Sequence, residues 1–159
     1  MVVLTEHQVR KIYDENIKKI VRYFGNRKAT TNNQLNGLCH QLFGNKYIGS
    51  FPQDYTPDKL PKRCYFILNT GLRKSKGEHW VAVYKSNHNY YVYDSFGRKN
   101  ENIISHFVDR MNKTKHKINF IDSDRDPEQY GNDSEDCGHR CISFLMVVED
   151  YGIRNALKI

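Results

Sequence analysis

Three short segments rich in aromatic and β-branched residues follow one another through the middle of the chain, and they constrain its fold most. They span residues 64–69, 80–84 and 90–93, and the polar run 86–89 separates the last two. Runs of this composition favour β-strands. The sequence therefore predicts three consecutive strands, of which the last two pair as an antiparallel hairpin.

Helical patterns lie on both sides of these strands. A capping box at Thr5 opens a run of apolar residues at helical spacing that should end near Gly25. A second run covers residues 103–111, and a third follows Cys137 and stops at Gly152. The third carries an apolar stripe that we expect to be buried, made of Cys141, Phe144, Leu145 and Val148.

The remaining segments are weaker predictions. Residues 117–121 have the composition of a further strand. Residues 27–62 are rich in Asn, Gly and Pro, so we expect them to be largely irregular, with one short helix at 38–43. The polar stretch 122–136 should be a surface loop. The fold class expected is α+β, a mixed β-sheet flanked by helices.

The bulk composition limits the broad class of protein. A chain of 159 residues with 38% hydrophobic residues suits one globular domain spanning residues 1–159. No run approaches the roughly 20 apolar residues of a membrane helix, and the N-terminus becomes polar too early for a signal peptide. We therefore expect a soluble protein made in the cytosol. Its four cysteines make no disulfide framework, which leaves free thiols, metal ligands or a catalytic thiol.

The chain is basic, with a formal net charge of +7. A charge of this size attracts polyanions such as DNA in a salt-dependent way. The basic residues fall in several clusters, near 18–28, 73–76 and 113–117, so a polyanion site would be a surface patch. The alternative is a solvated basic surface with no such partner.

One cysteine stands where its thiolate would be stabilised. Cys137 opens the last long helix, where unpaired backbone N–H groups and the helix dipole favour negative charge. The N–H of Cys137 can also point at a developing oxyanion, and we interpret Gly138 as leaving room for a substrate backbone.

A histidine and an acid are predicted to meet near the start of the hairpin. His79 lies just before the second strand, and Asp94 just after the third. In an antiparallel pair, the start of one strand lies beside the end of the next. His79 and Asp94 can therefore be neighbours and, with Cys137, form a Cys–His–Asp triad.

Each residue also has an ordinary explanation. A loop histidine is commonly solvated, a strand-end Asp is commonly a turn residue, and a helix-start Cys is commonly part of the core. A zinc site is a further alternative, made from Cys39, His40, Cys64, His139 and Cys141. However, the sequence has no Cys-x-x-Cys pair, so we expect no metal, and we assign Cys141 to the core.

Ordered motifs resemble those of adenain, the adenovirus maturation protease, and its viral relatives, within the superfamily that includes SUMO-specific proteases. The similarity covers most of the chain from about Leu42 onward. It runs through Phe43-Gly44, Phe51-Pro52, Leu68-Asn69-Thr70, Gly77-Glu78-His79-Trp80, Tyr93-Asp94-Ser95-Phe96-Gly97 and Cys137-Gly138-His139-Arg140-Cys141. The compact length is similar to the proteases of virophages and of related small DNA viruses or Maverick-type elements.

The resemblance implies roles for individual residues. Cys137 would be the nucleophile, His79 the base, Asp94 the orienting acid, and Gln129 the side-chain donor to the oxyanion. Gln129 lies one residue further from Cys137 than the family pattern suggests, so Asn132 remains an alternative donor. Trp80 would roof a narrow channel that admits only glycine before the cut, although core packing explains this residue equally well.

The resemblance also implies an activity and its partners. The chain would be a cysteine endopeptidase of the papain-like superfamily that cleaves viral capsid or core precursors, in the host cytoplasm or viral factory and in the virion. DNA would be a partner and a candidate activator, and no other cofactor is implied. Residues 116–126 contain no cysteine, so attachment of an activating peptide by a disulfide, as in adenain, does not carry over. The alternatives are a protease for ubiquitin-like proteins and a non-catalytic, basic nucleic-acid-binding module.

Overall fold

The centre of the fold is a five-stranded mixed β-sheet. The structure is a computed structural model, and it describes residues 2–74, 78–123, 126–129 and 135–159. The strands lie in the order β1-β2-β3-β4-β5, with antiparallel inner pairs and parallel outer pairs. Their bounds are β1 Tyr47–Pro52, β2 Arg63–Asn69, β3 Trp80–Ser86, β4 Asn89–Tyr93 and β5 Asn119–Asp122.

The three predicted central strands and their hairpin are confirmed. Ser86 pairs with Asn89, so a two-residue turn joins β3 to β4. Asn87 has a φ of 55° in this turn, a left-handed conformation that asparagine tolerates better than most residues. The hairpin places the start of β3 near the end of β4, where His79 and Asp94 flank the strands.

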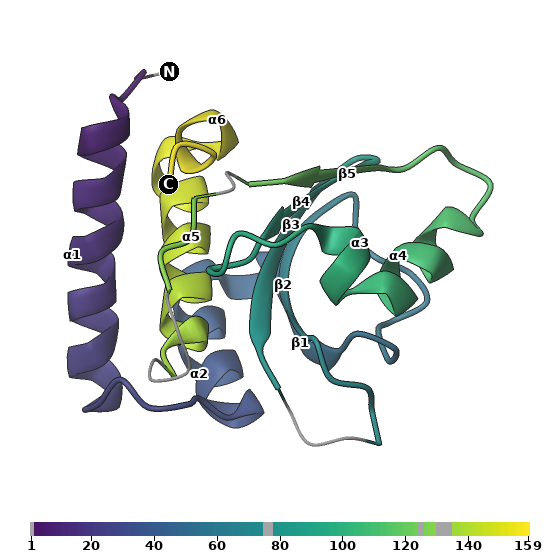
Figure 1. Cartoon of the computed structure of the whole chain (residues 1–159), viewed down its shortest axis with the longest axis horizontal. Coiled ribbons are helices and arrows are strands. Elements are labelled where there is room, and N and C mark those ends of the chain that lie inside the picture. Colours follow the sequence, from purple (N-terminus) through teal and green to yellow (C-terminus); the bar gives the residue numbers. More distant parts are fainter. Residues whose placement is uncertain (1, 75–77, 124–125, 130–134) are drawn as a thin grey trace.

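Helices cover both faces of the sheet (Figure 1). Helices α1 (Glu6–Phe24), α2 (Asn32–Phe43), α5 (Cys137–Tyr151) and α6 (Ile153–Ala156) lie on one face. Helices α3 (Asn100–Ile103) and α4 (Ser105–Asn112) lie on the other. A short 3-10 helix, Gly44–Lys46, leads into β1.

Strand β2 shows why the chain needs both helical layers. Tyr65 and Ile67 join the core beneath α1, α2 and α5, whereas Phe66 and Leu68 join the core beneath α4. A strand buried on both faces has an almost continuous apolar sequence instead of an alternating one. This is the pattern that made residues 64–69 easy to identify as a strand.

The N-terminal helix follows its sequence signals. Thr5 and Gln8 form the predicted capping box, and Gly25 ends the helix with a φ of 82°. The predicted helix at 103–111 is instead two short helices. Ile104 separates them with non-helical φ and ψ angles, and its fully buried side chain packs with Phe107 in the second core.

The expectation that residues 27–62 are largely irregular was wrong. This segment contains α2, which begins six residues before the predicted 38–43, and the edge strand β1. Strand β1 was missed because it carries Gly49 and Pro52, residues that are unfavourable inside strands. They are tolerated here because β1 pairs on one side alone and its register shifts between Tyr47 and Gly49.

Candidate active site

Asp94 is fixed by the turn that follows β4. Gly97 donates its N–H to the Asp94 carbonyl and has a φ of 70°, a conformation that favours glycine. The Asp94 carboxylate accepts N–H bonds from Phe96 (3.3 Å to Oδ1) and Arg98 (3.0 Å to Oδ2). The Arg98 side chain adds a 2.9 Å bond from Nε to Oδ2. The turn formed by the Asp-x-Phe-Gly sequence therefore fixes the position of one buried carboxylate.

His79 lies against this carboxylate, with 2.6 Å between His79 Nε2 and Asp94 Oδ1. Burial raises the pKa of Asp94, but the bonds from His79 and Arg98 outweigh it and lower the pKa to about 2. Asp94 is therefore an ionised acceptor at neutral pH, so Nε2 must carry the proton and donate it. This leaves Nδ1 of the ring for the thiol.

The pKa of His79 is raised overall. Burial lowers it, but hydrogen bonds with the Asp94 carboxylate and the Cys137 side chain raise it by more. A raised pKa favours the imidazolium form, which is the partner a thiolate needs. The ring also packs against Phe96, with 5.0 Å between centroids, so its orientation is fixed on two sides.

Cys137 is the first residue of α5, as predicted, and its sulfur faces the same group of residues. The backbone N–H of Trp80, the residue after His79, lies 3.5 Å from Cys137 Sγ. This second donor to the sulfur was not anticipated from the sequence. The structure thus brings Cys137, His79 and Asp94 together from three separate segments of the chain.

The other three cysteines have different surroundings. Cys39 and Cys141 are completely buried in the core on the α5 face, and Cys64 is 2% exposed, whereas Cys137 is 8% exposed. Burial raises the pKa of Cys39 to about 12 and that of Cys64 to about 11, and it raises the pKa of Cys141 well above its usual range. These thiols are held in the neutral form, so Cys137 is the thiol best placed for chemistry.

Residues 25–31, the α1–α2 loop, complete this side of the site. Thr30 accepts a 3.1 Å hydrogen bond at its carbonyl oxygen from Trp80 Nε1. Trp80 is partly buried and packs against the core on the α5 face, and this hydrogen bond ties its indole to the loop. Nothing in the spacing of the sequence relates Thr30 to residues 80 and 137, and this loop was missed.

The interpretation of Gly138 needs correction. A Cβ built on Gly138 would lie 2.0 Å from Thr30 Oγ1 and 3.2 Å from Leu35 Cδ2. The space beside this glycine is therefore filled by the protein's own loop and helix, and substrate does not occupy it. Gly138 is required because α5 packs directly against Thr30.

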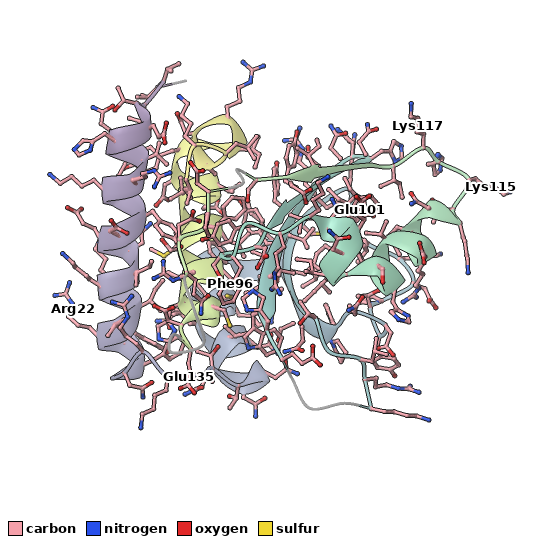
Figure 2. All side chains as sticks on the ribbon, viewed as in Figure 1. Arg22, Phe96, Glu101, Lys115, Lys117 and Glu135 are labelled. Carbon is pink, nitrogen blue, oxygen red and sulfur yellow. The ribbon has the colours of Figure 1, made fainter. Side chains whose placement is uncertain are left out.

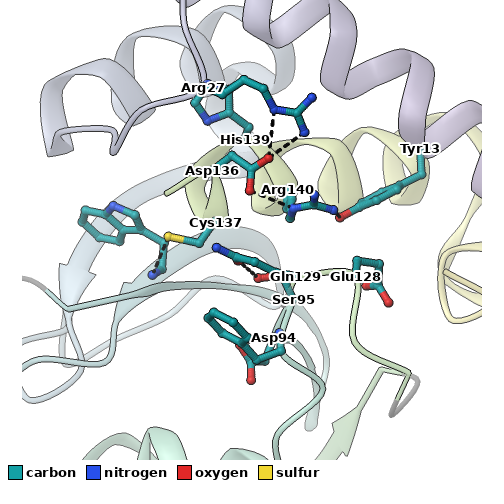
Figure 3. A network of polar contacts seen from close by, with 12 residues as sticks. Tyr13, Arg27, Asp94, Ser95, Glu128, Gln129, Asp136, Cys137, His139 and Arg140 are labelled. Atoms are coloured by element: carbon teal, nitrogen blue, oxygen red, sulfur yellow. Dashed lines mark hydrogen bonds and ion pairs between the residues drawn. The ribbon is translucent and has the colours of Figure 1, made fainter. Parts of the chain in front are cut away.

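Gln129 is buried beside the turn that holds Asp94. Its Oε1 accepts a 2.6 Å hydrogen bond from Ser95 Oγ, and its backbone N–H donates to the Ser95 carbonyl at 3.0 Å. Because Oε1 faces Ser95, the amide nitrogen is turned the other way, toward Cys137 (Figure 3). This orientation suits a donor to an oxyanion. The alternative donor, Asn132, lies outside the described residues.

Neither a metal centre nor a membrane-spanning helix is found among the residues that the structure describes. Within the parts of the chain that the structure describes, no group of three or more His, Cys, Asp or Glu residues could hold a metal ion. Over the same residues, no helix has the length and apolar character needed to cross a membrane.

Comparison with known proteins adds no relative to this picture. No protein-family model matches the sequence, and a search of curated proteins returns no significant match.

Proposed function

We propose that this protein is a cysteine endopeptidase of the adenain type, with the papain-like fold that its motifs imply. The observation that carries the proposal is the grouping of three residues: His79 Nε2 lies 2.6 Å from Asp94 Oδ1, and Cys137 Sγ lies 3.5 Å from the backbone nitrogen of Trp80, the residue after His79. An ionised acid holds one ring nitrogen of a buried histidine, and the thiol at the N-terminus of α5 lies beside the same segment of chain. Nucleophile, base and orienting group are the three parts of this chemistry.

The reaction follows from these contacts. Cys137 transfers its proton to His79, and the thiolate attacks the scissile carbonyl carbon. The resulting oxyanion is held by the amide of Gln129 and the N–H of Cys137. His79 then protonates the leaving amine, which departs and leaves a thioester. Water, deprotonated by His79, hydrolyses the thioester and regenerates the thiol.

The proposed substrates are capsid or core precursors of a small DNA virus, cleaved after glycine. The Trp80 indole is hydrogen-bonded to the Thr30 carbonyl, and the backbone N–H of Trp80 faces Cys137 Sγ. In the proposed mode of binding the ring borders a narrow passage in which a substrate Cβ would not fit. The resemblance to adenain supplies the precursors, and a ubiquitin-like protein with a Gly-ended cleavage site is the alternative. Cleavage of ubiquitin-like fusions in preference to virion precursors would decide for the alternative.

DNA is proposed as a partner of the basic surface. Figure 2 places Arg22 at one end of the molecule and Lys115 and Lys117 at the other. Positive charge spread in this way suits loose, non-specific contact with a polyanion. If the protein were only a nucleic-acid-binding module, DNA binding would survive Cys137→Ala and the thiol would show no unusual reactivity.

The test is covalent labelling by a peptide vinyl sulfone that ends in glycine, followed by mapping of the modified cysteine. We expect label on Cys137, its loss in His79→Ala, and its retention in Cys141→Ala, the control for a buried thiol in the same helix. An otherwise identical probe that ends in alanine should react more slowly, and Trp80→Ala should narrow that difference. Equal labelling of Cys137 with and without His79 would refute the proposal.

A further inference from the structure

Helix α5 begins with a carboxylate in the capping position that does not cap the helix. Asp136 is the N-cap residue, where an Asp side chain ordinarily accepts hydrogen bonds from the N–H groups of the first turn. Its side chain makes no such bond. Asp136 Oδ2 instead accepts from Arg27 Nη2 at 2.7 Å and Nε at 3.2 Å, and Oδ1 accepts from Arg140 Nε at 2.9 Å. We call Asp136, Arg27 and Arg140 the Asp136 clamp.

The orientation of this carboxylate matters because Asp136 directly precedes Cys137. A carboxylate turned onto the first turn of α5 would occupy the N–H groups that stabilise a thiolate. It would also place a second negative charge beside the sulfur, and like charges disfavour ionisation. Asp136 is buried, so this charge would be poorly screened by water.

Both arginines are themselves held in place. Arg27 lies in the α1–α2 loop next to Asn26, whose carbonyl accepts a 2.8 Å hydrogen bond from Nε2 of the buried His139. Arg140 Nη1 lies 3.4 Å from the hydroxyl of Tyr13 on α1. Figure 3 shows the two guanidinium groups approaching the Asp136 carboxylate from different sides.

The contacts of Arg140 also lead to the other residues of the site. The Tyr13 and Tyr93 hydroxyls are 2.5 Å apart, and Tyr93 donates to Glu128 Oε1 at 2.8 Å. Tyr93 precedes Asp94, and Glu128 precedes Gln129. The clamp is therefore one end of a polar network that touches the chain beside the nucleophile, the orienting acid and the oxyanion donor.

We propose that Arg27 and Arg140 are positioning residues that turn the Asp136 carboxylate away from α5 and neutralise it. The N–H groups and dipole of the first turn then act on the Cys137 thiolate. This inference rests on the proposed function, in which Cys137 reacts as a thiolate. Among the residues that the structure describes, the titratable and charged groups around Cys137 are the clamp, His139 beside it, His79 backed by Asp94, and Cys141 one turn further along α5.

The test measures the rate of Cys137 alkylation by iodoacetamide as a function of pH, with the modified peptide identified by mass spectrometry. In the double variant Arg27→Gln/Arg140→Gln, we expect the midpoint of the profile to move to higher pH. A shift of one unit makes alkylation about tenfold slower below the midpoint. Adding Asp136→Asn to the double variant removes the carboxylate charge that the two arginines no longer neutralise, and it should restore most of the wild-type alkylation rate.

Two controls separate the clamp from general effects. Arg63→Gln/Arg154→Gln removes the same charge from two exposed arginines, one at the far end of β2 from the site and one on α6, and should leave the profile unchanged. Arg27→Gln alone alters a side chain that is 54% exposed, so this variant should fold even if the double variant does not. It should shift the profile in the same direction by a smaller amount.

Two results would overturn the clamp. One is a wild-type alkylation profile in folded Arg27→Gln and in the double variant. The other is slow Cys137 alkylation in the triple variant Arg27→Gln/Arg140→Gln/Asp136→Asn. Since that variant lacks the Asp136 charge, slow alkylation there would come from lost packing. Peptide cleavage is measured separately. A wild-type protein that cleaves no Gly-containing peptide, yet shows the expected shifts, would count against the protease proposal and support the clamp.

Discussion

Replacing Gly138 by alanine should destabilise the protein, although alanine is the better helix former. The new Cβ would lie 2.0 Å from Thr30 Oγ1, where ordinary contacts begin near 3.4 Å, and Thr30 or the start of α5 must move. Overpacking of this kind costs about 1–3 kcal/mol. Replacing a helical glycine returns about 0.5–1 kcal/mol of backbone entropy. The two ranges centre on a net loss of about 1 kcal/mol, which lowers the melting temperature of a chain this size by about 2–4 °C.

The assay is thermal unfolding followed by circular dichroism, with Gly37→Ala as the matched control. Gly37 lies within α2, and a Cβ built there meets nothing within 4 Å, so this substitution should raise the melting temperature. Thr30→Ala in the Gly138→Ala background removes the closest atom and should recover part of the loss. Labelling of Cys137 should fall in Gly138→Ala, since Thr30 also anchors Trp80. If Gly138→Ala were as well tolerated as Gly37→Ala, the packing argument would be refuted.

Three further predictions concern the thiol, the acid and the charge. Cys137→Ala should abolish peptide cleavage. Cys141→Ala leaves a core cavity and should mainly lower the free energy of unfolding, by about 1 kcal/mol. Equal loss of turnover in the two variants, at equal folded fraction, would contradict this. The folded pKa of Asp94 is about 2, below its unfolded value of roughly 3.9. The ionised Asp94 carboxylate therefore stabilises the folded state by an amount on the order of 2 kcal/mol. This stabilisation is present above the unfolded pKa and is lost as pH falls toward 2. Urea unfolding of wild type and Asp94→Asn should therefore differ at neutral pH and converge in acid, and a gap that persists in acid would exclude this origin. Binding to duplex DNA should weaken linearly with the logarithm of salt concentration, and binding that salt leaves unchanged would contradict an electrostatic contact.

The three central strands and the meeting of His79 with Asp94 could be predicted because they depend on local patterns. Hairpin geometry alone places the residue before β3 beside the residue after β4, and the run 86–89 identifies the hairpin. The position of Cys137 at a helix start follows in the same way from the apolar stripe that begins after it. Tertiary packing joins α5 to the hairpin, and no residue spacing in the sequence indicates that contact.

The rest of the site could not be predicted for the same reason. Arg27 and Thr30 contact residues more than a hundred positions away, and their segment contains only polar and small residues that suggest a loop. Gly138 was assigned to substrate because a glycine beside a nucleophile has two explanations, close approach of a ligand or close approach of the chain itself. Only the position of Thr30 distinguishes them. Arg98, four residues after Asp94, was missed because its bond depends on the turn at Gly97.

The neighbours of the reactive residues explain how the site stays rigid. Alternation along β4 sends the Tyr93 ring into the α5 core, where it stacks on Phe144 with 4.7 Å between centroids. The next residue, Asp94, follows the strand end into the turn toward His79. A shift of α5 against the sheet would therefore break the stacking of Tyr93 and the approach of Cys137 to His79 together. Since core packing resists such sliding, the distance between thiol and imidazole is set by the same contacts that stabilise the fold.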